Sequence, residues 1–251
     1  SGTHGKTTTT SMTGIVFQEA GLDPTILVGG EVTTFGGNVV TGHSQYFITE
    51  ACEYVESFLK FYPYIGVILN VEADHLDYFR DLDHVMESFL KFTQLIPEGG
   101  SLVVSAECKN ALAIGERSGK PFVTFGIEAD ADYQATDLTY DEAGHAHYTL
   151  TSGGKRLCEV SLSVPGRHNV LNSLAVLATA VISGIDPEKA ALAIQKFIGT
   201  GRRFELKGTV EGITVIDDYA HHPTEIRATL EAAANLEHRR IWVVFQPHTY
   251  T

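Results

Sequence analysis

The sequence predicts an α/β fold: a doubly wound, mostly parallel sheet with an attached small antiparallel sheet, followed by the start of a second α/β domain. Short apolar runs alternate with helical patterns through the first half of the chain, which is typical of a parallel sheet covered by helices. Residues 132–164 then alternate polar and apolar side chains, which indicates three antiparallel strands. From Gly208 an apolar run, a helical pattern and another apolar run follow, so we expect a second domain to begin there.

Each element is identified from its residue pattern and from the turn residues at its ends. The predicted strands outside the antiparallel sheet are 25–28, 45–49, 65–69, 102–104, 121–125, 213–216 and 241–245. The predicted helices are 7–20, 82–95, 110–117, 167–183, 187–197 and 223–236. Gly29-Gly30 is expected to end the first strand, and residues 31–43 are interpreted as a loop. The predicted domains are 1–207 and a truncated 208–251.

Composition limits the classes of function. The 251 residues, 43% of them hydrophobic, can bury a sizeable core, and no apolar run approaches the roughly 20 residues that span a bilayer. A net charge of −13 disfavours binding to nucleic acid or anionic membranes. Cys52, Cys108 and Cys158 are few and widely spaced, which indicates a reducing compartment with neither a disulfide framework nor a cysteine zinc site.

The first eight residues, Ser1-Gly2-Thr3-His4-Gly5-Lys6-Thr7-Thr8, form the strongest motif. Gly2 and Gly5 allow backbone N–H groups to turn toward an anion, and the following helix adds positive potential at its N-terminus. Lys6 can place an ammonium on outer phosphates, while the Thr7 hydroxyl can ligate Mg²⁺. The pattern predicts the end of a phosphate-binding P-loop; the alternative is a glycine-rich turn before an ordinary helix. Because the chain begins inside this motif, we expect the natural protein to extend before Ser1.

Polar side chains follow four of the predicted strands, where ligands bind in open α/β sheets. They are Glu50; Asn70, Glu72, Asp74 and His75; Asp217 and Asp218; and Gln246 and His248. Glu50 is the first choice for holding Mg²⁺ beside the P-loop, and His75 is the second. The alternatives are an exposed strand-end carboxylate and a hydrogen-bonded loop histidine.

Three further groups are candidates for ligand contacts. Asn169 and Asn172 lie one helical turn apart and can read the edge of a purine, although either can instead serve as a helix cap. Arg202 and Arg203 can contact phosphate oxygens or be solvated. The stretch 217–225 holds three acids, a phenol and two imidazoles. We interpret it as a site for a transferring phosphoryl group or its metal; zinc fits less well, because there is no cysteine and the histidines are adjacent.

Together these motifs resemble the Mur ligase family, in the family's order and over the whole chain. The matching stretches are Gly2–Thr9, Glu50–Glu53, Asn70–Asp77, Pro165–Asn169, Arg202–Glu205, Asp217–Glu225 and Phe245–His248. His4 and the pair His221-His222 favour the alanine-adding members. The resemblance implies a three-domain protein, of which this chain is similar to the central ATP-binding domain (1–207) and the beginning of a C-terminal Rossmann-like domain (208–251).

The resemblance also implies roles for individual residues. The ATP phosphates are held by Lys6 and by the loop residues Gly2, Thr3, His4, Gly5, Thr7 and Thr8. One Mg²⁺ is held by Thr7 and Glu50, and His75 helps to hold a second. Adenine is contacted by Asn169 and Asn172, while Arg203, Asp218 and His221 close over the nucleotide. The implied catalytic residues are Lys6, His75, Asp218 and His221.

The implied reaction belongs to cytoplasmic peptidoglycan-precursor synthesis. ATP phosphorylates the carboxylate of UDP-N-acetylmuramate, and the amine of L-alanine attacks the acyl phosphate. A murein tripeptide-recycling ligase is the nearest alternative, a P-loop NTPase switch or motor is an alternative of another class, and a chain that binds nucleotide weakly or not at all is a third. Because the uridine and amino-acid sites belong mostly to the other domains, the chain alone is expected to be inactive in ligation.

Three positions depart from the family pattern. Cys52 stands where many members have Asp, and Thr249 stands where many close members have Arg. Lys91 lies near the lysine that several relatives carbamylate, without aligning to it, so the resemblance gives it no role.

Overall fold

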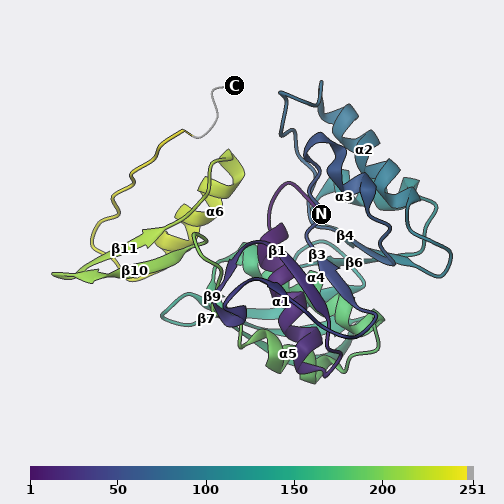
Figure 1. Cartoon of the computed structure of the whole chain (residues 1–251). Helices are drawn as coiled ribbons and strands as arrows, with labels where there is room; N and C mark the ends of the chain where they lie inside the picture. Colours follow the sequence, from purple (N-terminus) through teal and green to yellow (C-terminus); the bar gives the residue numbers. More distant parts are fainter. Residues whose placement is uncertain (248–251) are drawn as a thin grey trace.

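The computed structural model describes residues 1–247, and its largest sheet has six strands (Figure 1). Their order in the sheet follows their order in the chain: β4 (Ile65–Ile68), β5 (Ser101–Ser105), β6 (Phe122–Gly126), β7 (Tyr133–Tyr140), β8 (His145–Ser152) and β9 (Lys155–Pro165). The strands β4 to β7 run parallel, whereas β7, β8 and β9 pair antiparallel. The three antiparallel strands therefore extend the parallel sheet, as the residue pattern predicted.

Helices cover both faces of this sheet, which confirms the doubly wound α/β prediction. One face packs against α1 (Lys6–Glu19), α4 (Arg167–Ile182) and α5 (Pro187–Ile194), and the other packs against α2 (Leu82–Gln94), α3 (Lys109–Arg117) and the 3₁₀ helix η2 (Tyr54–Lys60). Successive strand residues point to opposite faces. Val103 of β5 accordingly belongs to the first core, while Leu102 and Val104 belong to the second.

A second sheet holds β2 (Gly37–Val40), β1 (Thr25–Val32) and β3 (Phe47–Thr49), with β1 parallel to β3 and antiparallel to β2. Two predictions are wrong here: β1 continues through Gly29-Gly30, and the expected loop 31–43 contains η1 (Thr33–Phe35) and β2. A Cβ at Gly29 would lie 2.8 Å from an oxygen of Glu50. The glycine therefore does not stop the strand but lets that carboxylate approach it.

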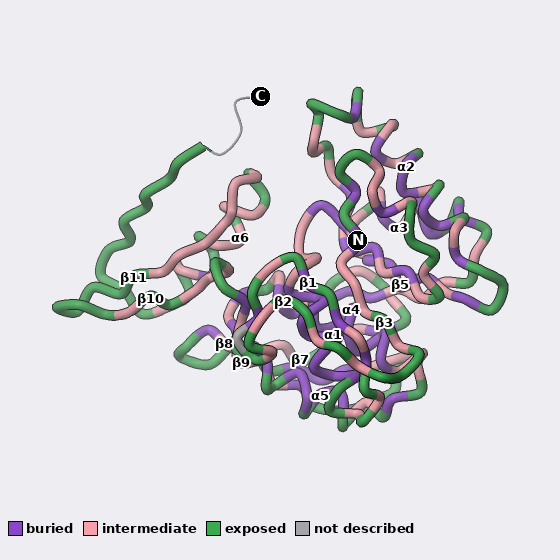
Figure 2. The backbone as a smooth tube through the Cα atoms, viewed as in Figure 1, coloured by how far each residue is buried: buried purple, intermediate pink, exposed green. Residues whose placement is uncertain are grey.

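Residues 202–247, called the C-terminal segment below, extend to one side of this body (Figure 1) and are largely exposed (Figure 2). β10 (Glu205–Val210) and β11 (Ile213–Asp217) form an antiparallel hairpin, and α6 (Pro223–Ala234) follows. The strand expected at 213–216 is present but exposed, with Ile213 66% accessible. The predicted division after residue 207 falls within β10 and remains a prediction.

The buried strand predicted at 241–245 is wrong for the described structure. These residues adopt no regular secondary structure, and Val244 is fully exposed. An apolar run becomes a buried strand only when a neighbouring strand takes its backbone hydrogen bonds, and within residues 1–247 no strand pairs with it. His248 and Thr249 lie outside the described residues. No helix in the described part of the chain has the length and apolar character needed to cross a membrane.

Candidate functional site

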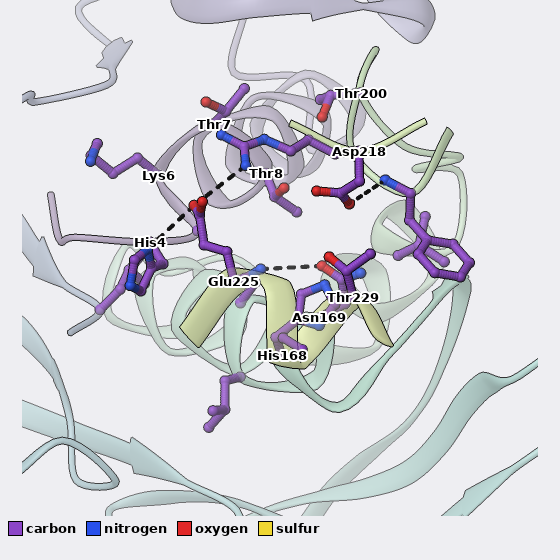
Figure 3. A pocket seen from close by; sticks show the side chains of 18 of the residues that line it. His4, Lys6, Thr7, Thr8, His168, Asn169, Thr200, Asp218, Glu225 and Thr229 are labelled. Carbon is purple, nitrogen blue, oxygen red and sulfur yellow. Dashed lines mark hydrogen bonds and ion pairs between the residues drawn. The ribbon is translucent and has the colours of Figure 1, made fainter. Parts of the chain in front are cut away.

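A cavity of about 1000 Å³ lies where the N-terminal loop, the ends of the parallel strands, the start of α4 and the C-terminal segment meet (Figure 3). Of the predicted site residues, the loop from Thr3 to Thr8, Glu50, Asn169, Asn172, Arg203 and Asp218 line it. Gly2, His75 and His221 are not among its lining residues. The fold thus brings most of the predicted residues around one cavity.

The loop is fixed to the end of β4. Ser1 N donates to Val67 O at 2.7 Å, and Thr3 N donates to Asn70 O at 3.2 Å. The Asn70 side chain accepts from His4 N at 2.7 Å and donates to His4 O at 3.1 Å. Gly5 has a φ of 82°, and a Cβ there would lie 2.5 Å from Asn172 Oδ1. Asn70, placed at this strand end by the sequence but given no role, is therefore the loop's main anchor.

Lys6 is held in place by the loop and by a buried acid. Its Nζ donates to Gly2 O at 2.6 Å, to Thr3 O at 3.2 Å and to Glu53 Oε1 at 3.0 Å. Glu53 is only 2% exposed, and its other oxygen has no hydrogen-bond partner. Glu53 lies in a stretch that matches the family pattern, but the sequence assigned it no function; its proximity to Glu50 in the chain was the available signal.

Thr7 and Glu50, which the sequence predicts as Mg²⁺ ligands, lie next to each other, and their binding of a metal ion remains a prediction. The Thr7 hydroxyl lies 3.1 and 3.3 Å from the two Glu50 oxygens, and Gly29 N donates to Glu50 Oε2 at 3.0 Å. The pair joins the first turn of α1 to the end of β3. Two hard oxygen donors therefore lie side by side next to the loop.

His75 lies next to Glu53, the buried acid that pairs with Lys6. Its backbone has a φ of 53°, and its Nε2 is 3.8 Å from both Glu53 Oε1 and Asp74 Oδ2. Its ring also packs on Tyr54, with the centroids 4.7 Å apart. Lys91 donates to Glu56 Oε1 at 2.9 Å, is 56% exposed and does not line the cavity.

The two asparagines at the start of α4 are buried and bonded to the protein. Asn169 Nδ2 donates to Pro165 O at 2.7 Å, and Asn172 Nδ2 donates to Asn169 Oδ1 at 3.2 Å. Asn172 Oδ1 also accepts from the Thr9 hydroxyl at 3.3 Å. The bond to Thr9 ties α4 to α1, and the other two hold the start of α4 in place. Both asparagines therefore have a structural task, and their contact with adenine remains a prediction.

Glu225 links the loop to the C-terminal segment (Figure 3). Its Oε1 lies 3.3 Å from His4 Nδ1 and 3.4 Å from Arg203 Nη1. Burial raises the pKa of this carboxyl, but the nearby His4 imidazole and Arg203 guanidinium outweigh it and lower the pKa to about 2. Glu225 is therefore ionised at neutral pH, a role the sequence did not assign to it.

The remaining predicted residues hold the C-terminal segment in shape. Asp218 accepts from the backbone N–H groups of Phe204 at 2.8 Å and Ala220 at 2.7 Å, and thereby fixes the chain next to Arg203. His221 Nδ1 is 3.0 Å from Tyr219 O, and the Arg203 guanidinium lies 5.5 Å from the Tyr219 ring centre. Arg203 and Asp218 thus reach the cavity side of this segment, while the reaction roles of Asp218 and His221 remain predictions.

Comparisons with known proteins agree with this geometry. The Mur ligase middle domain family matches residues 1–180, and the Mur ligase glutamate ligase domain family matches residues 202–250. The chain is 54% identical over 250 residues to a protein of Caldanaerobacter subterraneus and 53% identical over 251 residues to one of Clostridium tetani. Both relatives are named UDP-N-acetylmuramate–L-alanine ligase. All of this chain is covered, but it spans only 54% and 55% of their lengths.

Solved structures show the same arrangement. A UDP-N-acetylmuramate-alanine ligase from Thermotoga maritima has a TM-score of 0.82 at 33% identity, covering 94% of this chain and 53% of that protein. A UDP-N-acetylmuramate:L-alanyl-γ-D-glutamyl-meso-diaminopimelate ligase from Neisseria meningitides has a TM-score of 0.72 at 30% identity. The match covers 80% of this chain and 65% of that protein. The two Mur ligase family models match residues 1–180 and 202–250, and relatives at 53–54% identity match the whole chain. The chain therefore belongs to the Mur ligase family.

Proposed function

We propose that this chain is the ATP-binding part of a ligase that joins L-alanine to the carboxylate of UDP-N-acetylmuramate, in cytoplasmic peptidoglycan-precursor synthesis. The observation that carries the proposal is the grouping of Lys6, the Thr7–Glu50 pair and Arg203 around one cavity. The relatives at 53–54% identity carry the name of this activity, which supports the choice of substrates.

The donor atoms around the loop fit Mg²⁺. Mg²⁺ prefers oxygen ligands and is usually held by one or two carboxylates together with substrate phosphates. Thr7 and Glu50 supply such oxygens. The buried Glu53 is a further acceptor: its Oε2 has no hydrogen-bond partner, and its Oε1 lies 3.8 Å from His75 Nε2. We infer that Thr7 and Glu50 would hold one ion and His75 a second. Bound there, Mg²⁺ would neutralise phosphate charge and reduce its repulsion of the substrate carboxylate.

The chain's own residues would position the reactants and stabilise charge. The N–H groups at the start of α1 and the Lys6 ammonium hold the β- and γ-phosphates. Arg203 approaches from the opposite side of the cavity, where Asp218 and His221 keep the segment in shape. A carboxylate becomes a good electrophile only when its oxygen is made a leaving group. Transfer of the γ-phosphoryl group does this; the alanine amine then forms the C–N bond, phosphate leaves, and the amine loses a proton.

A tripeptide-recycling ligase is the second candidate, favoured by the 30% identical Neisseria structure. The test uses a protein of the curated relatives' length that contains this chain, with ATP, Mg²⁺, UDP-N-acetylmuramate and either L-alanine or the tripeptide. Mass spectrometry of the product separates the two, and we expect the alanine adduct. Phosphate release that depends on neither acceptor would instead favour an NTPase switch and overturn the proposal.

A further inference from the structure

Three side chains from distant parts of the sequence meet beside the cavity. His4 comes from the loop, Glu72 from the segment after β4, and His222 from the N-cap of α6. Each can offer one ligand atom so that all three atoms lie within 4.8 Å of one another. The His4 and His222 rings are packed together, with their centroids 4.6 Å apart. This cluster shares none of its residues with the Thr7–Glu50 pair.

The spacing suits a tetrahedral metal ion. Two ligands bound to Zn²⁺ at about 2.0–2.1 Å in tetrahedral geometry are roughly 3.3 Å apart. Glu72 Oε2 lies 3.5 Å from His4 Nε2 and 3.7 Å from His222 Nδ1. Small side-chain movements would close these gaps, and His222 Nδ1 would give up the 3.3 Å hydrogen bond that it accepts from Thr224 N. Two imidazoles and one carboxylate form a donor set that favours zinc and similar transition metals over Mg²⁺.

The surroundings of the cluster are also those of a metal site. A metal-binding histidine usually presents its second ring nitrogen to a carboxylate, which fixes the ring. His4 Nδ1 faces Glu225 Oε1 at 3.3 Å (Figure 3), which leaves Nε2 for Glu72 and its neighbour. The Thr224 hydroxyl donates to Glu72 Oε2 at 2.8 Å and orients that carboxylate.

His4 supplies an independent observation. Both of its ring nitrogens are shielded from solvent, yet neither makes a hydrogen bond. Buried polar atoms without a partner are rare, and a bound water or ion is what commonly satisfies them. The nitrogens face carboxylates at ion-pair distance, where a cation on the Nε2 side would satisfy both His4 and Glu72.

We propose that His4, Glu72 and His222 form a binding site for a divalent transition-metal ion of the Zn²⁺ type, separate from the Mg²⁺ ligands. The sequence pattern disfavoured zinc in 217–225 because His221 and His222 are adjacent. Folding removes that objection, since it supplies His222 with two partners from elsewhere in the chain. The ion would join the phosphate-binding loop to α6 and so fasten the C-terminal segment to the body.

The test is a titration of the metal-free chain with Zn²⁺, followed by calorimetry, with Co²⁺ as a spectroscopic probe of coordination. We expect one Zn²⁺ per chain in the presence of excess Mg²⁺, and the strong visible absorption of four-coordinate Co²⁺. Glu72→Gln and His222→Asn should each weaken Zn²⁺ binding by about tenfold or more. Asparagine keeps a good helix N-cap at position 222, so α6 should be preserved. Glu225→Gln, which weakens the outer contact with His4 and also the contact with Arg203, should weaken binding by about 10–100-fold.

The control is a histidine-rich cluster on the surface. His145 and His147 lie 3.1 and 3.8 Å from Asp141 Oδ2, and Asp141→Asn should leave the Zn²⁺ stoichiometry and affinity unchanged. Circular dichroism checks that each variant is folded. Undiminished Zn²⁺ binding in a folded Glu72→Gln or His222→Asn variant overturns the proposal. So does loss of binding in Asp141→Asn, or a weak, six-coordinate Co²⁺ spectrum in the unsubstituted chain.

Discussion

Lys6 shows how a single side chain connects the loop to the proposed chemistry. Its ammonium is held by two loop carbonyls and by Glu53, at distances from 2.6 to 3.2 Å. We expect Lys6→Ala to abolish ligation in the full-length protein, because loss of one preorganised charge costs about 3–4 kcal/mol at the transition state. Product formation under saturating Mg-ATP is the measurement, and a variant with most of its kcat intact contradicts the assignment.

Two controls separate this effect from misfolding. Lys91→Ala removes a lysine that is 56% exposed and pairs with Glu56, so ligation should persist. Lys6→Ala alone leaves the Glu53 carboxylate buried without its cation, which destabilises proteins. The double variant Lys6→Ala/Glu53→Gln removes that stranded charge and should be folded but still inactive.

Glu50 carries the second prediction at this scale. Because a neutral amide is a poorer ligand for a hard cation than a carboxylate, Glu50→Gln should raise the Mg²⁺ concentration needed for half-maximal activity. Its amide can still accept from Gly29 N, so the strand end should keep its shape. The measurement is activity against Mg²⁺ concentration, with the exposed Glu159→Gln as the control. A curve that coincides with that of the control removes Glu50 from the metal site.

The sequence predicted which residue types gather here better than it predicted their contacts. The closeness of Thr7 and Glu50 was predictable, because the carboxyl ends of strands in an open α/β sheet lie at the edge where the ligand-binding loop also lies. Glu53 and Glu225 were not given roles, since their burial depends on packing between segments 47 and more than 200 residues away from the loop. Asn169 and Asn172 were interpreted as base readers, but only the folded chain shows their bonds to Pro165 and Thr9.

At the scale of elements, α6 is fastened to the loop through Glu225, and this contact should depend on pH. The folded-state pKa of Glu225 is lowered from its ordinary value of 4.5 to about 2. A lowered pKa stabilises the fold above the ordinary value, and that contribution is lost as the pH falls from about 4.5 to about 2. We expect the free energy of unfolding of the unsubstituted chain to exceed that of Glu225→Gln at neutral pH, with the difference shrinking across this window.

Urea denaturation at a series of pH values measures this difference. Glu128→Gln is the matched control, because Glu128 makes an exposed ion pair with Arg167 and should contribute little. A difference between the unsubstituted chain and Glu225→Gln that stays constant down to about pH 2 would show that His4 and Arg203 do not hold this carboxylate ionised.

The helices with clear local signals at their ends were predicted well. The short, exposed strands that depend on pairing with a neighbouring strand were not. The helices α1, α2 and α4 begin and end within one or two residues of their predicted bounds, because local signals mark their ends: glycines flank α1 and α4, and Asp81 caps α2. β2 and β10 were missed, since each is a short, exposed strand that exists through pairing with β1 or β11. The run 241–245 was overpredicted for the complementary reason: its pattern is that of a strand, and the described chain gives it no neighbour.

At the scale of the whole molecule, the cavity is shared between the body and the C-terminal segment. Its lining includes Thr7 and Asn169 from one side, and Arg203, Asp218 and Glu225 from the other. Few other contacts hold the hairpin β10–β11, whose outward residues are exposed (Figure 2). A ligand that touches both sides should therefore stabilise the segment together with the loop.

Mg-ATP is expected to have that effect. A ligand that binds only the folded chain at about 100 times its Kd adds about 2.7 kcal/mol of stability. For a chain of this length that corresponds to a rise in Tm of roughly 5–10 °C. Hydrogen exchange should slow not only in the loop 1–8 but also in β10, β11 and α6, because Arg203 and Asp218 lie on the cavity side of their segment.

Lys6→Ala should abolish both the shift in Tm and the remote protection, whereas Lys91→Ala should preserve them. Protection confined to the loop would show that nucleotide binds the body alone, and the closing role proposed for Arg203, Asp218 and His221 would then be wrong.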